Sequence, residues 1–166
     1  VKSMKLTNSK PMPSKACLLC NFISSDIANA SQRSRRFISR EHIQYVAKEA
    51  YQVPDSENCQ KALAMVAEYS PDYLVNHSLR SYAFGIAMAH KAKQPFDKEV
   101  FFLGAIMHDL GLTSEFDTGN TFEVDGAKAA RSFCVEHEIN TEKADLVHEM
   151  VVHHNSVGIA HKLDPE

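Results

Sequence analysis

The feature that most constrains the fold is a succession of helical hydrophobic patterns, separated by capping residues, that begins at Ile38. Apolar residues recur at intervals of three and four positions, which is the spacing of one helix face. The alternation of apolar and polar residues that is typical of a half-buried strand does not occur over any length of the sequence. The sequence therefore predicts an all-α domain.

Capping and breaking residues divide this region into separate helices. We expect one helix after Ser39 and a second after the break at Pro54-Asp55-Ser56. A third begins with Ser70 as its cap and Pro71 at its first position, and a fourth runs from about Asp97 to Leu110 with Gly111 as its C-terminal stop. The fifth and sixth run from Thr121 through His137 and from Asn140 to Asn155.

The segment that precedes these helices has a different character. It is polar, contains Pro11 and Pro13, and shows no sustained period. We therefore expect two regions, a loosely structured N-terminal extension over residues 1–37 and a helical domain over residues 38–166. A length of 166 residues is enough for one domain with a real core.

Composition narrows the classes of partner. The formal charge is −3, and the only concentration of basic residues is Arg33, Arg35 and Arg36, so a nucleic-acid groove is not indicated. Apolar stretches fall short of the ~20 residues that span a bilayer. No signal-peptide pattern is present, and a transit peptide in the N-terminal segment is an open alternative. We expect no nucleic-acid and no membrane partner.

The four cysteines indicate a reducing environment. Cys17 and Cys20 have the spacing of a redox or zinc motif but lack a second pair, so ordinary thiols are the better interpretation. Cys59 and Cys134 fall in helical patterns and are expected to be small core residues. Reduced thiols fit a cytoplasmic location.

His108 and Asp109 are the most informative residues for chemistry. They end the apolar run Val100–Met107, and His77 stands 31 positions earlier in another predicted helix. Two imidazoles and a carboxylate can supply three ligands to one Zn, Fe or Mn ion. A metal would also compensate an aspartate that faces the unfavourable dipole at a helix C-terminus. The alternative is a pair of structural core histidines.

Three segments in order carry a family resemblance. They are Asn76-His77-Ser78-Leu79-Arg80, the stretch Met107-His108-Asp109-Leu110-Gly111, and Phe122-Glu123-Val124-Asp125-Gly126. From about Ile43 to Glu166 the chain resembles the HD-domain metalloenzyme superfamily and is most similar to its cyanamide-hydratase-like branch. The resemblance implies a helical bundle around a divalent metal, with zinc in first place and iron or manganese as alternatives. The implied ligands are His77, His108, Asp109 and a later Asp.

Two positions depart from the family pattern. The final Asp ligand belongs on a helix beyond the last one visible here, and the chain reaches Glu166 just before that helix would start. Asp164 precedes a proline in a loop-like stretch and is not assigned the role, so we expect a domain that lacks its last helix or an incomplete site. Nucleotide-cleaving members often carry a Glu three residues after the dyad, where this chain has Leu112.

The same resemblance suggests further site residues. A histidine at the end of the sixth helix lines the cavity, and His153 fits that role best, although a structural role fits it equally well. His154 fits a solvated surface position better than a substrate-binding one. Glu123 is a candidate proton shuttle, or equally a first-turn residue of a helix capped by Thr121. Arg80 and Lys128 are candidates for holding substrate, although exposed basic residues are usually solvated.

The leading hypothesis is a metal-dependent hydrolase or hydratase that uses a metal-activated water on a small molecule, with a nitrile-type compound as the substrate class that the resemblance implies. His153 or Glu123 would relay protons. The alternatives are an HD phosphohydrolase acting on a phosphate ester, or a degenerate HD module that serves as a binding protein. The oligomeric state stays open, a homo-oligomer included.

Overall fold

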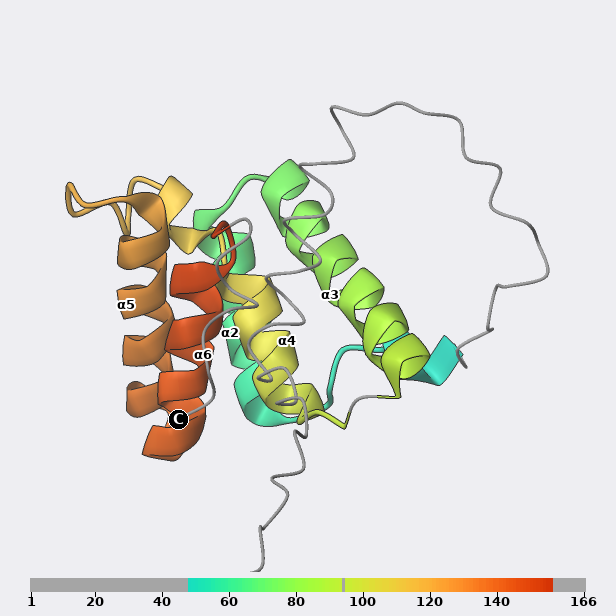
Figure 1. Cartoon of the computed structure of the whole chain (residues 1–166). Coiled ribbons are helices and arrows are strands. Elements are labelled where there is room, and N and C mark those ends of the chain that lie inside the picture. Colours follow the sequence, from blue (N-terminus) through green and yellow to red (C-terminus); the bar gives the residue numbers. More distant parts are fainter. Residues whose placement is uncertain (1–47, 94, 157–166) are drawn as a thin grey trace, which may run out of the picture.

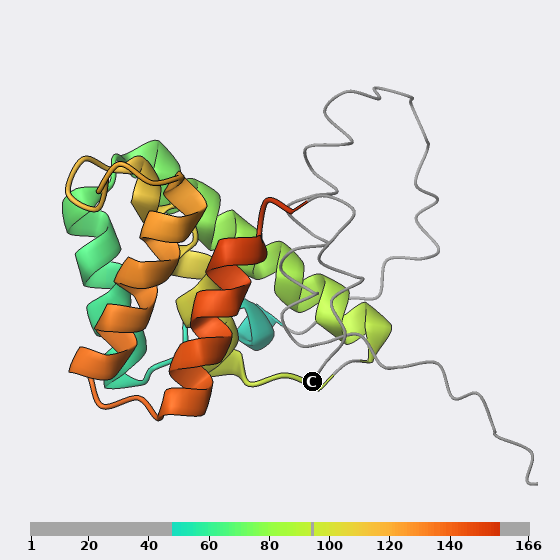
Figure 2. The same cartoon turned by 60° about the vertical axis from the view of Figure 1, so that its left-hand side comes forward.

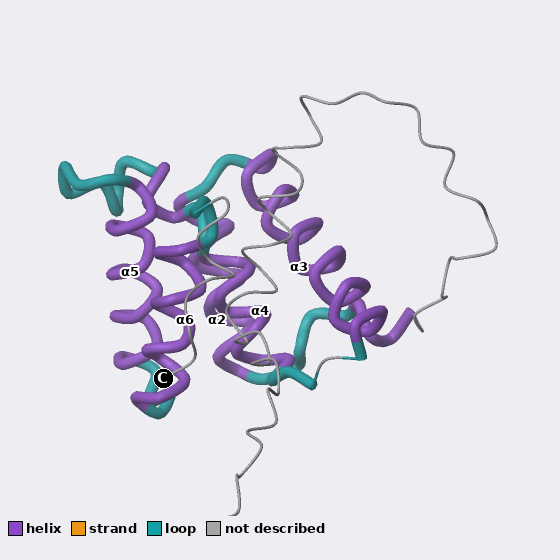
Figure 3. The backbone as a smooth tube through the Cα atoms, in the orientation of Figure 1, coloured by secondary structure: helices purple, strands orange, loops and turns teal. Residues whose placement is uncertain are grey.

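The computed structural model describes residues 48–93 and 95–156, and all its regular elements there are helical (Figure 3). In chain order they are η2 (Lys48–Tyr51), α2 (Glu57–Tyr69), α3 (Asp72–Ala92), α4 (Lys98–Met107), η3 (Leu110–Leu112), α5 (Phe122–Glu136) and α6 (Thr141–His153). The prediction of an all-α domain is confirmed. Within these ranges no helix is long and apolar enough to cross a membrane.

Helix α4 forms the centre of the bundle. Every residue from Val100 to Met107 is buried, and the helix contacts α2, α3, α5 and α6. A helix that is apolar on all sides has no polar face for solvent, so it is stable only when other helices cover all its sides. The helix that ends in the His-Asp pair is therefore the most enclosed one, and its C-terminal end delivers that pair into the interior.

The other helices surround α4 in two groups. Helices α5 and α6 lie side by side in both views, and α3 crosses the opposite side of the bundle at an angle (Figures 1 and 2). Gly85 sets the approach of α3, because a Cβ atom there would lie 2.2 Å from Cζ of Phe101 on α4. The absence of a side chain at this position thus allows close contact between these two helices.

Local side-chain caps begin three of the helices as the sequence predicts. Ser56 accepts from the Cys59 amide, Asp97 from the Glu99 and Val100 amides, and Asn140 from the Lys143 amide. Each oxygen satisfies a donor that has no partner inside the helix.

Two expected helix boundaries are wrong. Ser70 does not cap α3, because the extended Pro71 is the N-cap and the Ser70 amide instead closes α2 by donating to Val66 O at 2.9 Å. Gly111 is not the stop of α4 either, since that helix ends at Met107 and the chain continues through η3. Gly111 has a packing role, described below.

Cys59 and Cys134 are free thiols with no exposed surface, as expected of core residues, and burial raises the pKa of Cys134 to about 11. Several other predictions fall outside the described residues. They are the helix after Ser39 up to Ala47, the roles of Cys17 and Cys20, the extension over residues 1–37, and the environment of Asp164.

Candidate metal centre

The end of α4 positions the His-Asp pair. His108 keeps helical dihedral angles as the C-cap residue, and Asp109 turns the chain with φ −105° and ψ 11°. The Asp109 carbonyl accepts from the Leu112 amide at 3.0 Å, which starts the single turn of η3. Two adjacent side chains that would point apart in a continuing helix are thereby directed to one place.

His77, His108 and Asp109 converge on one point, and their ligand atoms all lie within 4.8 Å of one another. Nε2 of His108 lies 3.2 Å from Nε2 of His77 and 3.1 Å from Oδ2 of Asp109. The remaining separation, from His77 Nε2 to Asp109 Oδ2, is 3.5 Å. Two ligands bound at about 2.1 Å to one tetrahedral or octahedral ion lie about 3.0–3.4 Å apart, so the triangle fits a shared divalent metal.

The ring nitrogen of His108 that carries the proton also supports a shared metal. Its Nδ1 donates to the Ala105 carbonyl at 2.8 Å, so in the neutral ring Nε2 carries a lone pair. That lone pair faces the Asp109 carboxylate, which is also an acceptor. Two acceptors at this distance repel each other unless a cation lies between them. A hydrogen bond from the other ring nitrogen to a carbonyl is also the usual way in which proteins orient a metal-binding histidine.

The site is buried on one side and open on the other. His108 has no exposed surface, and 12% of the Asp109 side chain is exposed, whereas 41% of the His77 side chain is exposed. His108 and Asp109 therefore form the buried side of the candidate site, and solvent reaches the site from the side of α3. Burial raises the pKa of the Asp109 carboxyl, but the hydrogen bonds and positive charges that His108 and His154 contribute when both nitrogens of each ring carry a proton outweigh it and hold the pKa below its usual range.

His154, and not His153, is the α6 histidine at this site. The prediction that His154 is a solvated surface residue is wrong, because it is only 2% exposed. Its Nε2 lies 3.6 Å from Oδ1 of Asp109, and its ring packs edge-on against the His108 ring with centroids 5.0 Å apart. Its Nδ1 donates to the Val151 carbonyl at 2.6 Å, which directs Nε2 at the aspartate. His153 is half-buried, and no described contact joins it to the dyad.

The helical period of α6 contains the signal that separates the two histidines. The buried residues of this helix are Ala144, Val147, Met150 and Val151. Position 154 follows Val151, Met150 and Val147 at intervals of three, four and seven, whereas position 153 has such a spacing from Met150 alone. Extending the core stripe by one turn would therefore have placed His154 inside.

A family comparison agrees with this arrangement. The HD domain model matches residues 74–165, which is more than half of the chain. The chain belongs to the HD domain family. HD domains are typical of metal-dependent hydrolases and bind divalent metals, and His77, His108 and Asp109 all lie within the matched range. The chain matches no curated protein and no solved structure.

Two glycines of this HD domain bring the second and third motif segments together. A Cβ on Gly111 would lie 1.9 Å from the Phe122 carbonyl oxygen and 2.7 Å from the Gly126 amide nitrogen, so the backbone of η3 rests directly on the first turns of α5. A Cβ on Gly126 would meet Gly111 N at 3.1 Å and His108 O at 3.4 Å. The segment after the dyad is thereby held against α5, which packs along α6.

Glu123 lies in the first turn of α5 and accepts from the Asn155 side chain at 3.2 Å. Burial raises the pKa of its carboxyl, but hydrogen bonds from its own amide, from Asn155 and from Thr121, together with the charge of His154, lower it overall. Thr121 is the N-cap as expected, although its side chain makes no cap bond to the helix backbone. Glu123 is thus an ionised carboxylate close to His154, and sequence reasoning missed its partner Asn155.

The two basic candidates lie in different places. Arg80 is exposed on α3, three residues after His77 and hence on a neighbouring part of the same face. Lys128 is exposed on α5, and its Nζ lies 3.9 Å from Oδ1 of Asp125. No described contact joins Lys128 to the histidines. Leu112 is 55% exposed.

Proposed function

We propose that this chain is a metal-dependent hydrolase or hydratase that adds water to a small molecule at the centre formed by His77, His108 and Asp109. The observation that carries the proposal is the triangle of ligand atoms, with separations of 3.1, 3.2 and 3.5 Å. A divalent cation held there would lower the pKa of a water molecule toward neutrality and so supply a nucleophile at ordinary pH. Zinc, iron and manganese all accept this mixture of nitrogen and oxygen ligands.

His154 is the proposed proton acceptor in place of His153. Because its Nδ1 is engaged by the Val151 carbonyl, the free lone pair of the neutral ring lies on Nε2, beside Asp109. Phe122 packs against this ring at a centroid distance of 5.6 Å and limits its movement. A general base needs this combination of a directed acceptor and a fixed orientation.

A nitrile-type carbon is the proposed electrophile, in line with the resemblance to the cyanamide-hydratase-like branch. In such a hydration the water oxygen would bond to the nitrile carbon as one π bond of the C≡N group breaks, and one water proton would pass to His154 Nε2 and then to the substrate nitrogen. The resulting imidic acid would tautomerise to the amide. Glu123, held as a carboxylate near His154, would stabilise the transient imidazolium. The two segments that carry this resemblance, His-Asp-Leu-Gly and Phe-Glu-x-x-Gly, pack together through Gly111 and Gly126.

A phosphate ester is the second candidate substrate. The exposed guanidinium of Arg80 lies one turn from His77 and could hold a phosphate oxygen. The leucine at position 112 argues against the nucleotide-cleaving type, because a carboxylate three residues after the dyad is absent.

The test is to reload the metal-free protein with Zn²⁺, Fe²⁺ or Mn²⁺ and to assay each form with cyanamide, simple nitriles and a phosphate monoester. We expect hydration of a nitrile-type compound in the wild type and none in His108→Ala. Hydrolysis of the phosphate ester alone would favour the second candidate. Stoichiometric metal binding without turnover of either class would overturn the proposal in favour of a binding module.

A further inference from the structure

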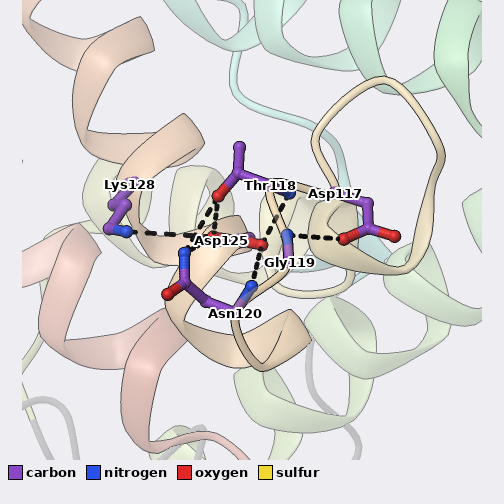
Figure 4. A network of polar contacts seen from close by, with 6 residues as sticks. All are labelled: Asp117, Thr118, Gly119, Asn120, Asp125 and Lys128. Atoms are coloured by element: carbon purple, nitrogen blue, oxygen red, sulfur yellow. Dashed lines mark hydrogen bonds and ion pairs between the residues drawn. The ribbon is translucent and has the colours of Figure 1, made fainter.

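The loop over residues 113–121 joins the metal dyad to α5, and Asp125 holds that loop. Asp125 lies on α5, is only 2% exposed, and accepts four hydrogen bonds from two residues of the loop (Figure 4). Thr118 donates its amide to Oδ2 at 2.8 Å and its hydroxyl to Oδ1 at 2.6 Å. Asn120 donates its amide to Oδ2 at 3.2 Å and its side-chain Nδ2 to Oδ1 at 2.8 Å.

This arrangement uses the full acceptor capacity of one carboxylate. Figure 4 shows Asp125 between Thr118 and Asn120, with Lys128 approaching from the other side at 3.9 Å. Asn120 Nδ2 also donates to Thr118 Oγ1, and Gly119 donates to Asp117 Oδ1, which closes the tip of the loop on itself. Hydrogen bonds to an ionised acceptor are about twice as strong as neutral ones. The hydrogen bonds from Thr118 and Asn120 hold the pKa of the Asp125 carboxyl far below its usual range, so it stays ionised.

The other end of the loop is joined to the dyad through equally short links. Thr113 donates both its amide and its hydroxyl to the Leu110 carbonyl, at 3.0 and 2.8 Å. Leu110 directly follows Asp109, whose carbonyl accepts from the Leu112 amide. Between these residues, Gly111 lies against Phe122 and Gly126 of α5, which precede and follow Asp125 in the chain. The Thr113 carbonyl in turn accepts from the Phe116 and Asp117 amides, both at 3.2 Å, so hydrogen bonds connect the dyad turn to the residue before Thr118, whose amide donates to the Asp125 carboxylate.

We infer that Asp125 is a positioning residue for the metal centre: by holding the loop on α5, it fixes the turn that carries Asp109 relative to His154 on α6. The inference rests on the proposed function, because it assigns the residue a purpose at that site. The geometry at stake is the 3.6 Å separation between Asp109 Oδ1 and His154 Nε2 and the 3.1 Å separation between Asp109 Oδ2 and His108 Nε2. A purely local role would confine the effect of Asp125 to the loop tip.

Four variants of the full chain test the inference. Asp125→Asn keeps the shape but replaces one acceptor oxygen by an NH₂ donor that faces the loop donors. Thr118→Val removes one hydroxyl donor without changing volume, and Thr118→Ser retains that donor. Asp145→Asn breaks an exposed ion pair with Arg131 between the same two helices, α5 and α6, and is the matched control.

The first readout needs no metal. Hydrogen exchange of the metal-free protein should show faster exchange at the Thr118 and Asn120 amides in Asp125→Asn, and also at the Leu112 and Thr113 amides of the dyad turn, by tenfold or more. Thr118→Val should show the same pattern to a smaller extent, and Thr118→Ser and Asp145→Asn should match the wild type. Faster exchange confined to residues 118–120, with Leu112 and Thr113 unchanged, would overturn the inference.

The second readout is the affinity for Co²⁺, followed by its visible absorption well below the unfolding temperature of each variant. Loss of an outer contact at a metal site typically weakens binding by ~10–100-fold, so we expect a loss near the lower end of that range for Asp125→Asn. Unchanged affinity would overturn the inference. A wild type that fails to bind Co²⁺ would count against the metal centre itself, while hydrogen exchange would still decide whether Asp125 fixes the dyad turn.

Discussion

His108 and His154 share one design at the level of single residues. Each donates Nδ1 to a carbonyl three residues earlier in its own helix, Ala105 for one and Val151 for the other. Each consequently directs its Nε2 at the Asp109 carboxylate, His108 toward Oδ2 and His154 toward Oδ1. The three candidate ligands were predictable from residue type, from spacing and from the family resemblance, because two imidazoles and a carboxylate can share one divalent metal. The choice between His153 and His154 depends on the helical register of α6, which the spacing of its buried residues contains.

At this scale the first prediction separates the two neighbouring histidines. His154→Gln should lower kcat by ~10²–10⁴-fold, the usual contribution of a general base, while metal content stays near that of the wild type. His153→Gln is the matched control and should change kcat little, because His153 makes no described contact with the dyad. Steady-state kinetics on the substrate found for the loaded protein, together with metal analysis, makes the comparison. The reverse order of effects would return the role to His153.

At the level of elements, three helix starts were readable from the sequence, whereas the start of α3 and the contacts between elements were not. Ser56, Asp97 and Asn140 cap their helices through oxygens only two or three residues from the donors, so the signal is local. Gly111 was expected to end a helix, because sequence alone does not reveal that its missing side chain admits the Phe122 carbonyl of another helix. The pairing of Asp125 with the loop was missed for the same reason, since it depends on how that loop folds back.

Gly111→Ala provides the prediction at this scale. The added Cβ would meet backbone atoms at 1.9 and 2.7 Å, which cannot rotate away, so η3 must shift from α5. We expect the free energy of unfolding to fall by about 1–3 kcal/mol, as for other overpacked sites, and metal affinity to fall as well. Urea unfolding and a metal titration measure the two effects.

Ser56→Ala is the matched control for that experiment. Loss of the α2 cap, whose Oγ accepts from Cys59 N at 3.3 Å, should cost about 1 kcal/mol. Because α2 carries none of the candidate metal ligands, its loss of stability should leave metal affinity unchanged. Equal losses of affinity in the two variants would mean that general destabilisation, and not the position of η3, governs the site.

On the scale of the whole molecule, one enclosed helix organises both the core and the chemistry. α4 contacts four other helices, and its C-terminal end presents His108 and Asp109 where α3 and α6 bring further histidines. The all-α class followed from the sequence, because the periodicity of apolar residues determines it, whereas the central position of the apolar helix was found only in the structure. The angle at which α3 crosses α4, which decides whether His77 reaches the dyad, depends on packing around Gly85 and Phe101 and was not predictable.

Acid stability is the prediction at this scale. The pKa of Asp125 is lower in the folded state than in the unfolded chain, so the folded state binds fewer protons and Asp125 stabilises it above the unfolded pKa of about 4. That contribution is lost as the pH falls from about 4 through the folded pKa. Asp125→Asn should therefore be less stable than the wild type at pH 7, with the difference shrinking below pH 4. Urea unfolding across this range measures it, and a difference that stays constant down to low pH would contradict the assignment.

The central claim is that His77, His108 and Asp109 together bind one divalent metal ion. Its most direct test is the metal content of the purified chain after dialysis against Zn²⁺ and then against metal-free buffer, measured by mass spectrometry beside His108→Ala, His77→Ala and the control His148→Ala. The account predicts close to one equivalent of zinc in the wild type and in His148→Ala, and loss of that zinc in the two ligand variants while circular dichroism still reports a helical fold. A wild type that retains no metal, or a His108→Ala variant that retains a full equivalent, would contradict it.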